Sequence, residues 1–199
     1  MRALTGEPAF RNIQNLEAIV FRQSYILEMN YYTQMKAYGD ILQTASNVQT
    51  GMRTYQRELA LPHVVTMRFL LAQAYFFSTA YGSCLDELEI LLRMKHADTI
   101  SDLHRDARIM QLLSHFMLGN YQLCESLITS LQRSLLKQKN TFKTYSELFS
   151  FLKKHMFDIQ KPDIRAFRKK LEVLAKKEKT VFGNFDLLQW ADGRGLTKE

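Results

Sequence analysis

The side chains best suited to acid–base or metal chemistry are five histidines and two groups of carboxylates. The histidines are His63, His96, His104, His115 and His155. No two of them have the four-residue spacing of a zinc-binding helix. The carboxylates occur as Asp86-Glu87-x-Glu89 and Asp102-x-x-x-Asp106. Such groups also occur on solvated helix faces and near helix N-termini, where the macrodipole favours them. We therefore predict no metal ligand, no cofactor and no catalytic residue, and we expect the chain not to be an enzyme.

A run of basic side chains offers a different chemistry, the binding of anions. The formal net charge is +7, and residues 133–179 alone carry 14 Lys and Arg against 5 Asp and Glu. The most crowded stretch contains Arg165, Arg168, Lys169, Lys170, Lys176 and Lys177. A basic patch can hold phosphates or steer an acidic partner. The same spacing is typical of the solvated face of an amphipathic helix, and no aromatic residue is interleaved on that face for base stacking. We favour the solvated face and keep a nucleic-acid-binding or regulatory role of residues 133–179 as the alternative.

The cysteines and the apolar stretches indicate the compartment. Cys84 and Cys124 have no CxxC or Cys/His neighbours, which favours two free thiols in a reducing compartment. The most apolar stretch, residues 69–77, is shorter than the ~20 residues of a membrane span. The first ten residues contain no long apolar region of the kind found in signal peptides. We expect a cytoplasmic protein without membrane contact.

The elements that must position these side chains all have the period of an α-helix. Apolar residues recur at spacings of three and four, Gly (8) and Pro (3) are scarce, and no segment alternates as a strand does. The first helix carries an apolar stripe of Phe10, Ile13, Leu16 and Val20. In all, the pattern predicts nine helices, over about residues 8–31, 36–58, 62–79, 81–94, 97–118, 121–135, 141–157, 162–177 and 181–191.

A short motif recurs at three helix junctions. It is Tyr-x-x followed by a small or apolar residue, and it begins at Tyr38, Tyr81 and Tyr121. Before Tyr121, Gly119 lets the chain leave one helix in a left-handed conformation, and Asn120 supplies an acceptor for the amides of the next helix. Each Tyr then marks the corner of an antiparallel helix hairpin.

The residues around these corners resemble the tetratricopeptide (TPR) repeat. Its large, small and aromatic positions match Leu71, Ala72 and Tyr75 in one helix, and its second-helix positions match Cys84, Leu88 and Leu91 in the next. Arg68 stands where an aromatic is usual, and Leu112 stands where a small residue is usual. The stretch HFMLGNYQLCESLITSLQRSLLK, together with FDLLQW near the end, resembles an uncharacterised group of bacterial TPR-like proteins.

The resemblance implies an all-α, TPR-like array of antiparallel helix hairpins, wound as an α-α superhelix. We expect one domain over residues 1–192 and a polar tail over residues 193–199. In such an array the first helices line a concave groove. The groove would be lined by Thr66, Phe69, Gln73, Phe77, Asp106, Ile109, Leu113 and Met117.

The implied function is a non-catalytic protein–protein interaction module or scaffold that binds a peptide or helix in this groove. The partner would be another protein or peptide, and we do not expect nucleic acid. Two alternatives stay open at this point. Another helix of the same chain can cover the groove, and the chain can associate with itself.

Overall fold

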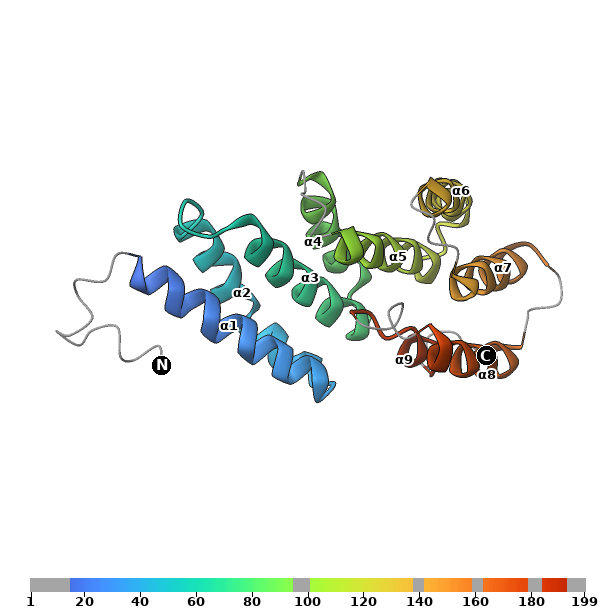
Figure 1. Cartoon of the computed structure of the whole chain (residues 1–199), viewed down its shortest axis with the longest axis horizontal. Coiled ribbons are helices and arrows are strands. Elements are labelled where there is room, and N and C mark those ends of the chain that lie inside the picture. The colour runs from blue at the N-terminus through green and yellow to red at the C-terminus, as the bar shows by residue number, and fades with distance from the viewer. Residues whose placement is uncertain (1–14, 95–100, 138–141, 159–162, 179–183, 193–199) are drawn as a thin grey trace. The chain divides into compact units, whose positions relative to one another are not determined.

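Nine α-helices make up the part of the chain that the computed structural model describes, which is residues 15–94, 101–137, 142–158, 163–178 and 184–192 (Figure 1). The helices are α1 (Leu16–Gln34), α2 (Tyr38–Thr54), α3 (Leu61–Phe77), α4 (Tyr81–Arg93), α5 (Ser101–Met117), α6 (Tyr121–Lys137), α7 (Lys143–Phe157), α8 (Ile164–Lys177) and α9 (Leu187–Asp192). No strand occurs within these ranges. The all-α class and the helical array are therefore confirmed, and the superhelix stays a prediction.

The chain divides into two compact units between Ala107 and Arg108, within α5. Unit 1 comprises residues 1–107 and contains α1 to α4 with the first turns of α5. Unit 2 comprises residues 108–199 and contains the rest of α5 and α6 to α9. The single domain over residues 1–192 stays a prediction, and the tail at 193–199 lies outside the described residues.

Unit 1 is organised around α3. The helices α1, α2 and α4 all contact α3, and α1 also contacts α2 (Figure 1). This is why α3 is apolar on nearly all sides, since a helix with neighbours on several flanks buries most of its surface. The interior of the unit contains Met29, Ile41, Val48, Met67 and Leu71, each fully buried.

The buried face of α1 differs from the predicted stripe. The side chains that α1 buries are Ala18, Phe21, Tyr25 and Met29. Leu16 and Val20 are only half-buried, while Phe10 and Ile13 lie outside the described residues. The ring of Phe21 lies against Gly51 of α2, where a Cβ atom would come within 2.0 Å of the ring. Phe21 packs closely against Gly51, and another apolar side of α1, with Leu27, Tyr31 and Met35, faces outward.

The three predicted corners share one backbone geometry. The helices α2, α4 and α6 begin at Tyr38, Tyr81 and Tyr121. Two residues before each Tyr, φ is positive: 55° at Lys36, 62° at Thr79 and 78° at Gly119. The next amide donates to a carbonyl five residues back, as in a Schellman motif: Ala37 to Tyr32 at 2.9 Å, Ala80 to Tyr75 at 2.9 Å, and Asn120 to His115 at 3.0 Å. The equivalence of the three corners is confirmed.

The role predicted for Asn120 needs correction. Its side chain makes its hydrogen bond backward, with Nδ2 lying 3.2 Å from His115 Nδ1 at the end of α5. Its backbone carbonyl accepts the amide of Cys124 at 3.1 Å, which starts α6. The side chain of Asn120 therefore contacts the preceding helix, while its backbone carbonyl belongs to the start of the next one.

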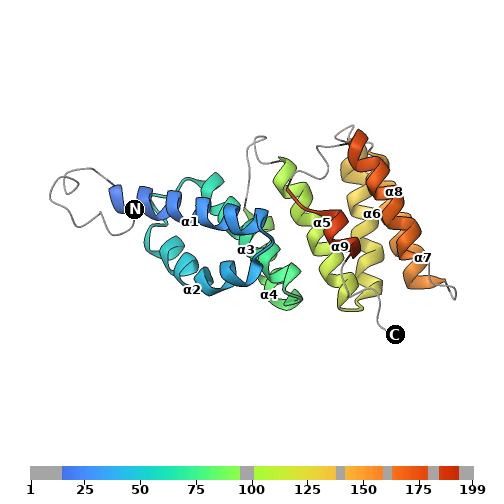
Figure 2. The same cartoon turned by 90° about the horizontal axis from the view of Figure 1, so that it is seen from below.

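Unit 2 is held together by an aromatic cluster. Phe151 of α7 stacks on Phe167 of α8 with ring centroids 4.1 Å apart, and Trp190 of α9 meets the edges of both at 6.4 Å. Phe116 of α5 contacts His155 and Trp190 from the other side. Figure 2 shows α6, α7 and α8 running alongside one another. The six-residue helix α9 buries Leu187, Trp190 and Ala191, and Asp192 pairs with Arg168 of α8.

Candidate binding surfaces

The residues of the predicted groove are mostly interior side chains. Five of the eight are at most 2% exposed: Phe69, Gln73, Asp106, Ile109 and Leu113. The other three, Thr66, Phe77 and Met117, are partly exposed. The groove positions from Thr66 to Asp106 lie in unit 1, and Ile109, Leu113 and Met117 lie in unit 2. A side chain this deeply buried offers almost no surface to a peptide, so the chain's own packing uses most of the positions assigned to the groove.

Three of these positions have specific partners within unit 1. Phe77 stacks on Tyr38 with ring centroids 4.8 Å apart. The hydroxyl of Thr66 donates to the carbonyl of Pro62 at 2.9 Å. Asp106 accepts from the side-chain Nε of Arg105 at 3.2 Å, in a pair whose side chains are at most 6% exposed. Of these three contacts, only the one between Phe77 and Tyr38 joins two helices.

The basic residues of α8 fall into two groups. Arg168 is ion-paired with Glu172 and Asp192, and Lys170 lies 3.1 Å from Glu147 of α7. In the described residues no ion pair involves the other members of the patch, which are all exposed: Arg165, Lys169, Lys176 and Lys177. The first group joins α8 to α7 and α9, and only the second group is available to an anion.

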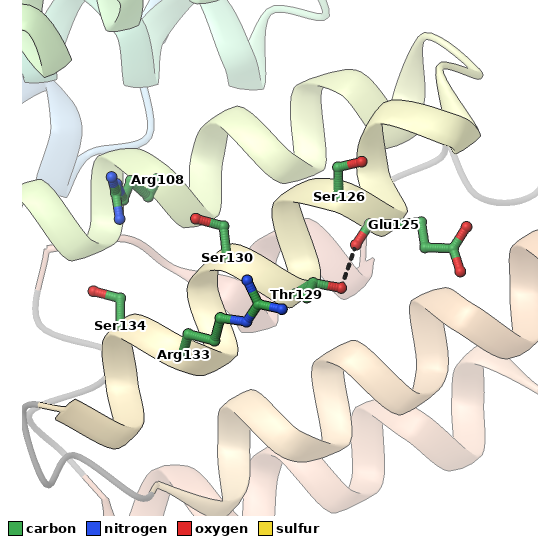
Figure 3. Close-up of a pocket in the computed structure, with 7 residues that line it drawn as sticks. All are labelled: Arg108, Glu125, Ser126, Thr129, Ser130, Arg133 and Ser134. Atoms are coloured by element: carbon green, nitrogen blue, oxygen red, sulfur yellow. Dashed lines mark hydrogen bonds between the residues drawn. The ribbon is translucent and has the colours of Figure 1, made fainter.

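A shallow polar depression of about 670 Å³ lies on α5 and α6 (Figure 3). It is lined by Arg108, Glu125, Ser126, Thr129, Ser130, Arg133 and Ser134. The Thr129 hydroxyl donates a hydrogen bond to the backbone carbonyl of Glu125 at 3.0 Å. The Glu125 carboxylate lies at the end of the depression away from Arg108 (Figure 3). The lining residues on α6 belong to its polar side, while the apolar side of that helix is buried. We find no buried polar side chain directed into the depression from the residues that line it, so it has the character of a solvated helix face.

The outer face of α1 has the opposite character. It consists of Ile19, Gln23, Leu27, Asn30, Tyr31, Gln34 and Met35. Its apolar members are 40% to 63% exposed, and none of the seven is charged. The charged residues of α1 are Glu17, Arg22 and Glu28, and Lys36 follows the helix. A helix that faces water usually carries charged residues on its outer side, so this face is unusual for a solvated surface.

Sequence reasoning did not single out this face. The signal was present, because apolar residues follow α1 on both sides: Phe21, Tyr25 and Met29 on one, Leu27, Tyr31 and Met35 on the other. With apolar residues on both sides, periodicity does not decide which side is buried. The decision depends on contacts with α2 and α3.

Of the two buried carboxylates in the sequence-predicted groups, Glu87 and Asp106, Glu87 has partners on two other helices. Glu87 of Asp86-Glu87-x-Glu89 is 4% exposed and lies between two other helices of unit 1. Arg68 Nη1 of α3 is 2.6 Å from Glu87 Oε2, and Gln49 Nε2 of α2 donates to Glu87 Oε1 at 2.6 Å. Arg68, the departure from the TPR pattern, is thus the counter-charge of Glu87. The cluster joins α2, α3 and α4.

The remaining titratable groups do not converge on one place. Burial lowers the pKa of His63 and of His115, and the positive charge of Arg22 adds to the effect at His63. Burial raises the pKa of the Cys124 thiol to about 11, and Cys84 and Cys124 are both free and buried. Over the described ranges, no three His, Cys, Asp or Glu side chains are grouped as metal ligands would be. No helix in the same ranges is long and apolar enough to cross a bilayer.

Comparison of the chain with protein-family models, with curated proteins and with solved structures found no match. The class supported at this point is an all-α helical array with three equivalent helix corners. The TPR-like assignment and the bacterial group stay predictions.

Proposed function

We propose that the chain is a non-catalytic protein-interaction module whose contact surface is the outer face of α1. The observation that supports this most is the exposure of Leu27, Tyr31 and Met35 on a face without charge. Exposed apolar patches bounded by polar residues mark protein contact sites, and interface centres favour Tyr and Met over charged residues. With the half-buried Leu16 and Val20 beside it, this surface runs the length of the helix.

The proposal keeps the class of function that the TPR resemblance implies and moves the contact surface. The predicted groove is a weaker candidate, since Phe69, Gln73 and Leu113 would have to be uncovered first. Uncovering large apolar side chains costs about 1.5–3 kcal/mol each. A ready-made outer face needs no such step. We also propose a cytoplasmic location, because Cys84 and Cys124 are free thiols.

Paired capture with matched variants tests the contact surface. The bait with Leu27→Glu and Tyr31→Glu places two charges on the outer face, and the control with Leu136→Glu and Val173→Glu places two charges on exposed apolar sites of α6 and α8. We expect proteins cross-linked to α1 in the wild type to be retained by the control and lost by the α1 variant. Identical sets of bound proteins with both variants would contradict the proposal.

A second candidate is the binding of a polyanion, including nucleic acid, by α8. It is favoured by one observation, the four exposed basic side chains outside the ion pairs: Arg165, Lys169, Lys176 and Lys177. Replacing all four by Gln should weaken binding to oligonucleotides and reduce the slope of log affinity against log salt by about 0.9 per lost phosphate contact. Fluorescence anisotropy over a salt series measures both. Binding that shows no salt dependence would exclude this candidate.

A further inference from the structure

We propose that α9 is a displaceable segment that occupies a peptide-binding pocket of unit 2, and that a partner peptide with the apolar pattern of α9 binds there in its place. The pocket is formed by Phe116 of α5, Phe151 of α7 and Phe167 of α8, which all belong to unit 2. The proposal therefore goes beyond the contact face on α1 and does not depend on it. Three features support it: the walls of the pocket, the short helix that fills it and the pattern of side chains by which that helix is held.

The walls of the pocket come from three helices other than α9. The rings of Phe116, Phe151 and Phe167 each lie 6.4 Å from the ring of Trp190 between centroids, and each meets it edge to face at 74° to 87°. These walls also contact one another. Phe151 stacks on Phe167 at 4.1 Å, and the ring of His155 lies between Phe116 and Phe151, at 5.2 and 6.0 Å from them. The pocket thus has its own supporting contacts, and α9, which lies against α8 (Figure 1), supplies the occupant.

The occupant is held weakly for a buried element. The helix α9 has six residues, and helices shorter than ~12–15 residues are marginal in water on their own. The burial of Phe185, Leu187 and Trp190 must therefore offset the ordering of the whole segment. Trp190 is 4% exposed, and its Nε1 has no hydrogen-bond acceptor among the described residues, which weakens the fit further.

Release of α9 leaves no charge buried without a partner. Asp192 pairs with Arg168, but both side chains are partly exposed, and Arg168 keeps its pair with Glu172 when Asp192 leaves. The N-terminal cap of α9 is local, since Asp186 Oδ1 accepts the amide of Gln189 at 2.9 Å, and it departs with the segment. Exposed ion pairs contribute little to stability, so apolar burial decides whether α9 stays in place.

The segment itself shows the chemistry of a partner that fits. Its anchors are Phe185, Leu187 and Trp190, an aromatic, a leucine and a tryptophan on one short helical stretch. Short apolar helices that lie in a groove bind other proteins through such anchors, and Trp contributes most in a closed pocket. Residues 184–192 also contain two Asp and no Lys or Arg, whereas residues 133–179 are strongly basic. An acidic peptide with this anchor pattern is therefore the expected partner.

Native-state hydrogen exchange of the wild-type chain tests whether α9 leaves the pocket. The amide of Trp190 donates to the carbonyl of Asp186 at 3.1 Å, so it is protected while α9 is in place. We expect its protection factor to be at least ~10-fold lower than those of Leu148 and Leu152, which are fully buried in α7. Equal protection of α9 and α7 would overturn the proposal, because α9 would then open only together with the fold.

Binding of a labelled peptide with the sequence of residues 184–192 to the full chain tests the pocket. Leu187→Asp places a carboxylate at a position of α9 that is 1% exposed and should release the segment, and Leu136→Asp, on the exposed side of α6, is the matched control. The peptide should bind Leu187→Asp at least ~10-fold more tightly than the wild type or the control, because the chain's own α9 keeps most pockets occupied. Fluorescence anisotropy measures the three affinities. A peptide with alanine in place of the tryptophan should not bind.

Trp190 is the only tryptophan of the chain, so its emission reports directly on α9. The emission should move to longer wavelength in Leu187→Asp and stay unchanged in Leu136→Asp, while circular dichroism should show nearly the same helix content in both. A Leu187→Asp variant that loses the helices of unit 2 would overturn the proposal, since a displaceable segment is not required for the rest to fold. A folded variant that keeps the wild-type emission, or that binds the peptide no better than the wild type, would overturn it as well.

Discussion

At the scale of single residues, the structure gives two unusual side chains a clear role. Arg68 interrupts an otherwise apolar helix because the carboxylate of Glu87 is buried opposite it. Thr79 holds a left-handed conformation, with φ at 62°, that a β-branched residue rarely adopts. Arg68 neutralises the buried carboxylate of Glu87. Thr79 is strained because the helix corner requires a positive φ at its position.

Removing the positive charge from the buried pair should destabilise the protein strongly. We expect Arg68→Met to lower the free energy of unfolding by about 3 kcal/mol, because Glu87 is left buried without its counter-charge. The double variant Arg68→Met with Glu87→Leu should recover most of this loss, since neither charge remains. Urea unfolding followed by circular dichroism measures both. A single variant within ~0.5 kcal/mol of the wild type would contradict the assigned role of the pair.

The strained corner should be relieved by glycine. Thr79→Gly is expected to raise the free energy of unfolding by about 0.5–1 kcal/mol, because the left-handed penalty of about 1–2 kcal/mol outweighs the entropy cost of a glycine. Gly119→Ala should have the opposite sign, a loss of about 1 kcal/mol, although an added Cβ would meet no atom within 4 Å.

Gly82 provides the matched control for these two corner positions. It also has nothing within 4 Å of an added Cβ, but it lies inside α4 rather than at a corner. Gly82→Ala should therefore stabilise by about 0.5–1 kcal/mol through helix propensity. Thermal melts of the three variants give the signs. The same sign for Gly82→Ala and Gly119→Ala would refute the corner geometry.

At the scale of elements, the ends of helices depend on distant residues. The carboxylate of Glu178, just past α8, accepts from the amides of Lys143 and Thr144 at 3.0 and 3.1 Å and from the Thr144 hydroxyl at 2.7 Å. It therefore caps the N-terminus of α7, where the helix dipole favours a negative charge. Asp163 caps α8 locally, by accepting from the amide of Arg165 at 2.8 Å. One cap is visible in sequence, and the other depends on the α7–α8 contact.

The Glu178 cap should make stability depend on pH. Partial burial acts to raise the pKa of Glu178, but the hydrogen bonds from Thr144 and the amide and charge of Lys143 outweigh it, so the pKa is lowered. A carboxyl group with a lowered folded-state pKa stabilises above its unfolded pKa of about 4.3 and loses that contribution as the pH falls through the folded value.

We therefore expect Glu178→Gln to destabilise by about 1 kcal/mol between pH 5 and pH 8, and the difference from the wild type to shrink below about pH 4. Urea midpoints measured across this range provide the test. Glu125→Gln, on the exposed face of α6, is the control and should change nothing beyond ~0.5 kcal/mol. A deficit that persists undiminished into acid would show that the cap acts through shape rather than charge.

At the scale of the whole molecule, charge and exposed apolar surface belong to different units. The basic stretch lies in unit 2, on α7 and α8, while the uncharged outer face of α1 lies in unit 1. Proteins with a net charge far from zero resist non-specific association.

The sequence by itself determined the local elements of this protein. Periodicity predicted all nine helices, and Tyr38, Tyr81 and Tyr121 marked corners that share one hydrogen-bond pattern. These features depend on residues only a few positions apart, so the sequence alone is enough to predict them. Leu88 and Leu91, at positions that match the TPR pattern, are buried.

Only the tertiary structure decided which face of α1 is buried, what opposes Glu87 and what caps α7. Each depends on contact between residues far apart in sequence: Phe21 with Gly51, Arg68 with Glu87, and Thr144 with Glu178. Periodicity gives a helix its apolar sides but not its neighbours. For the same reason, residues such as Phe69 and Leu113 fit a groove in sequence, while the packing of the chain places them in its interior.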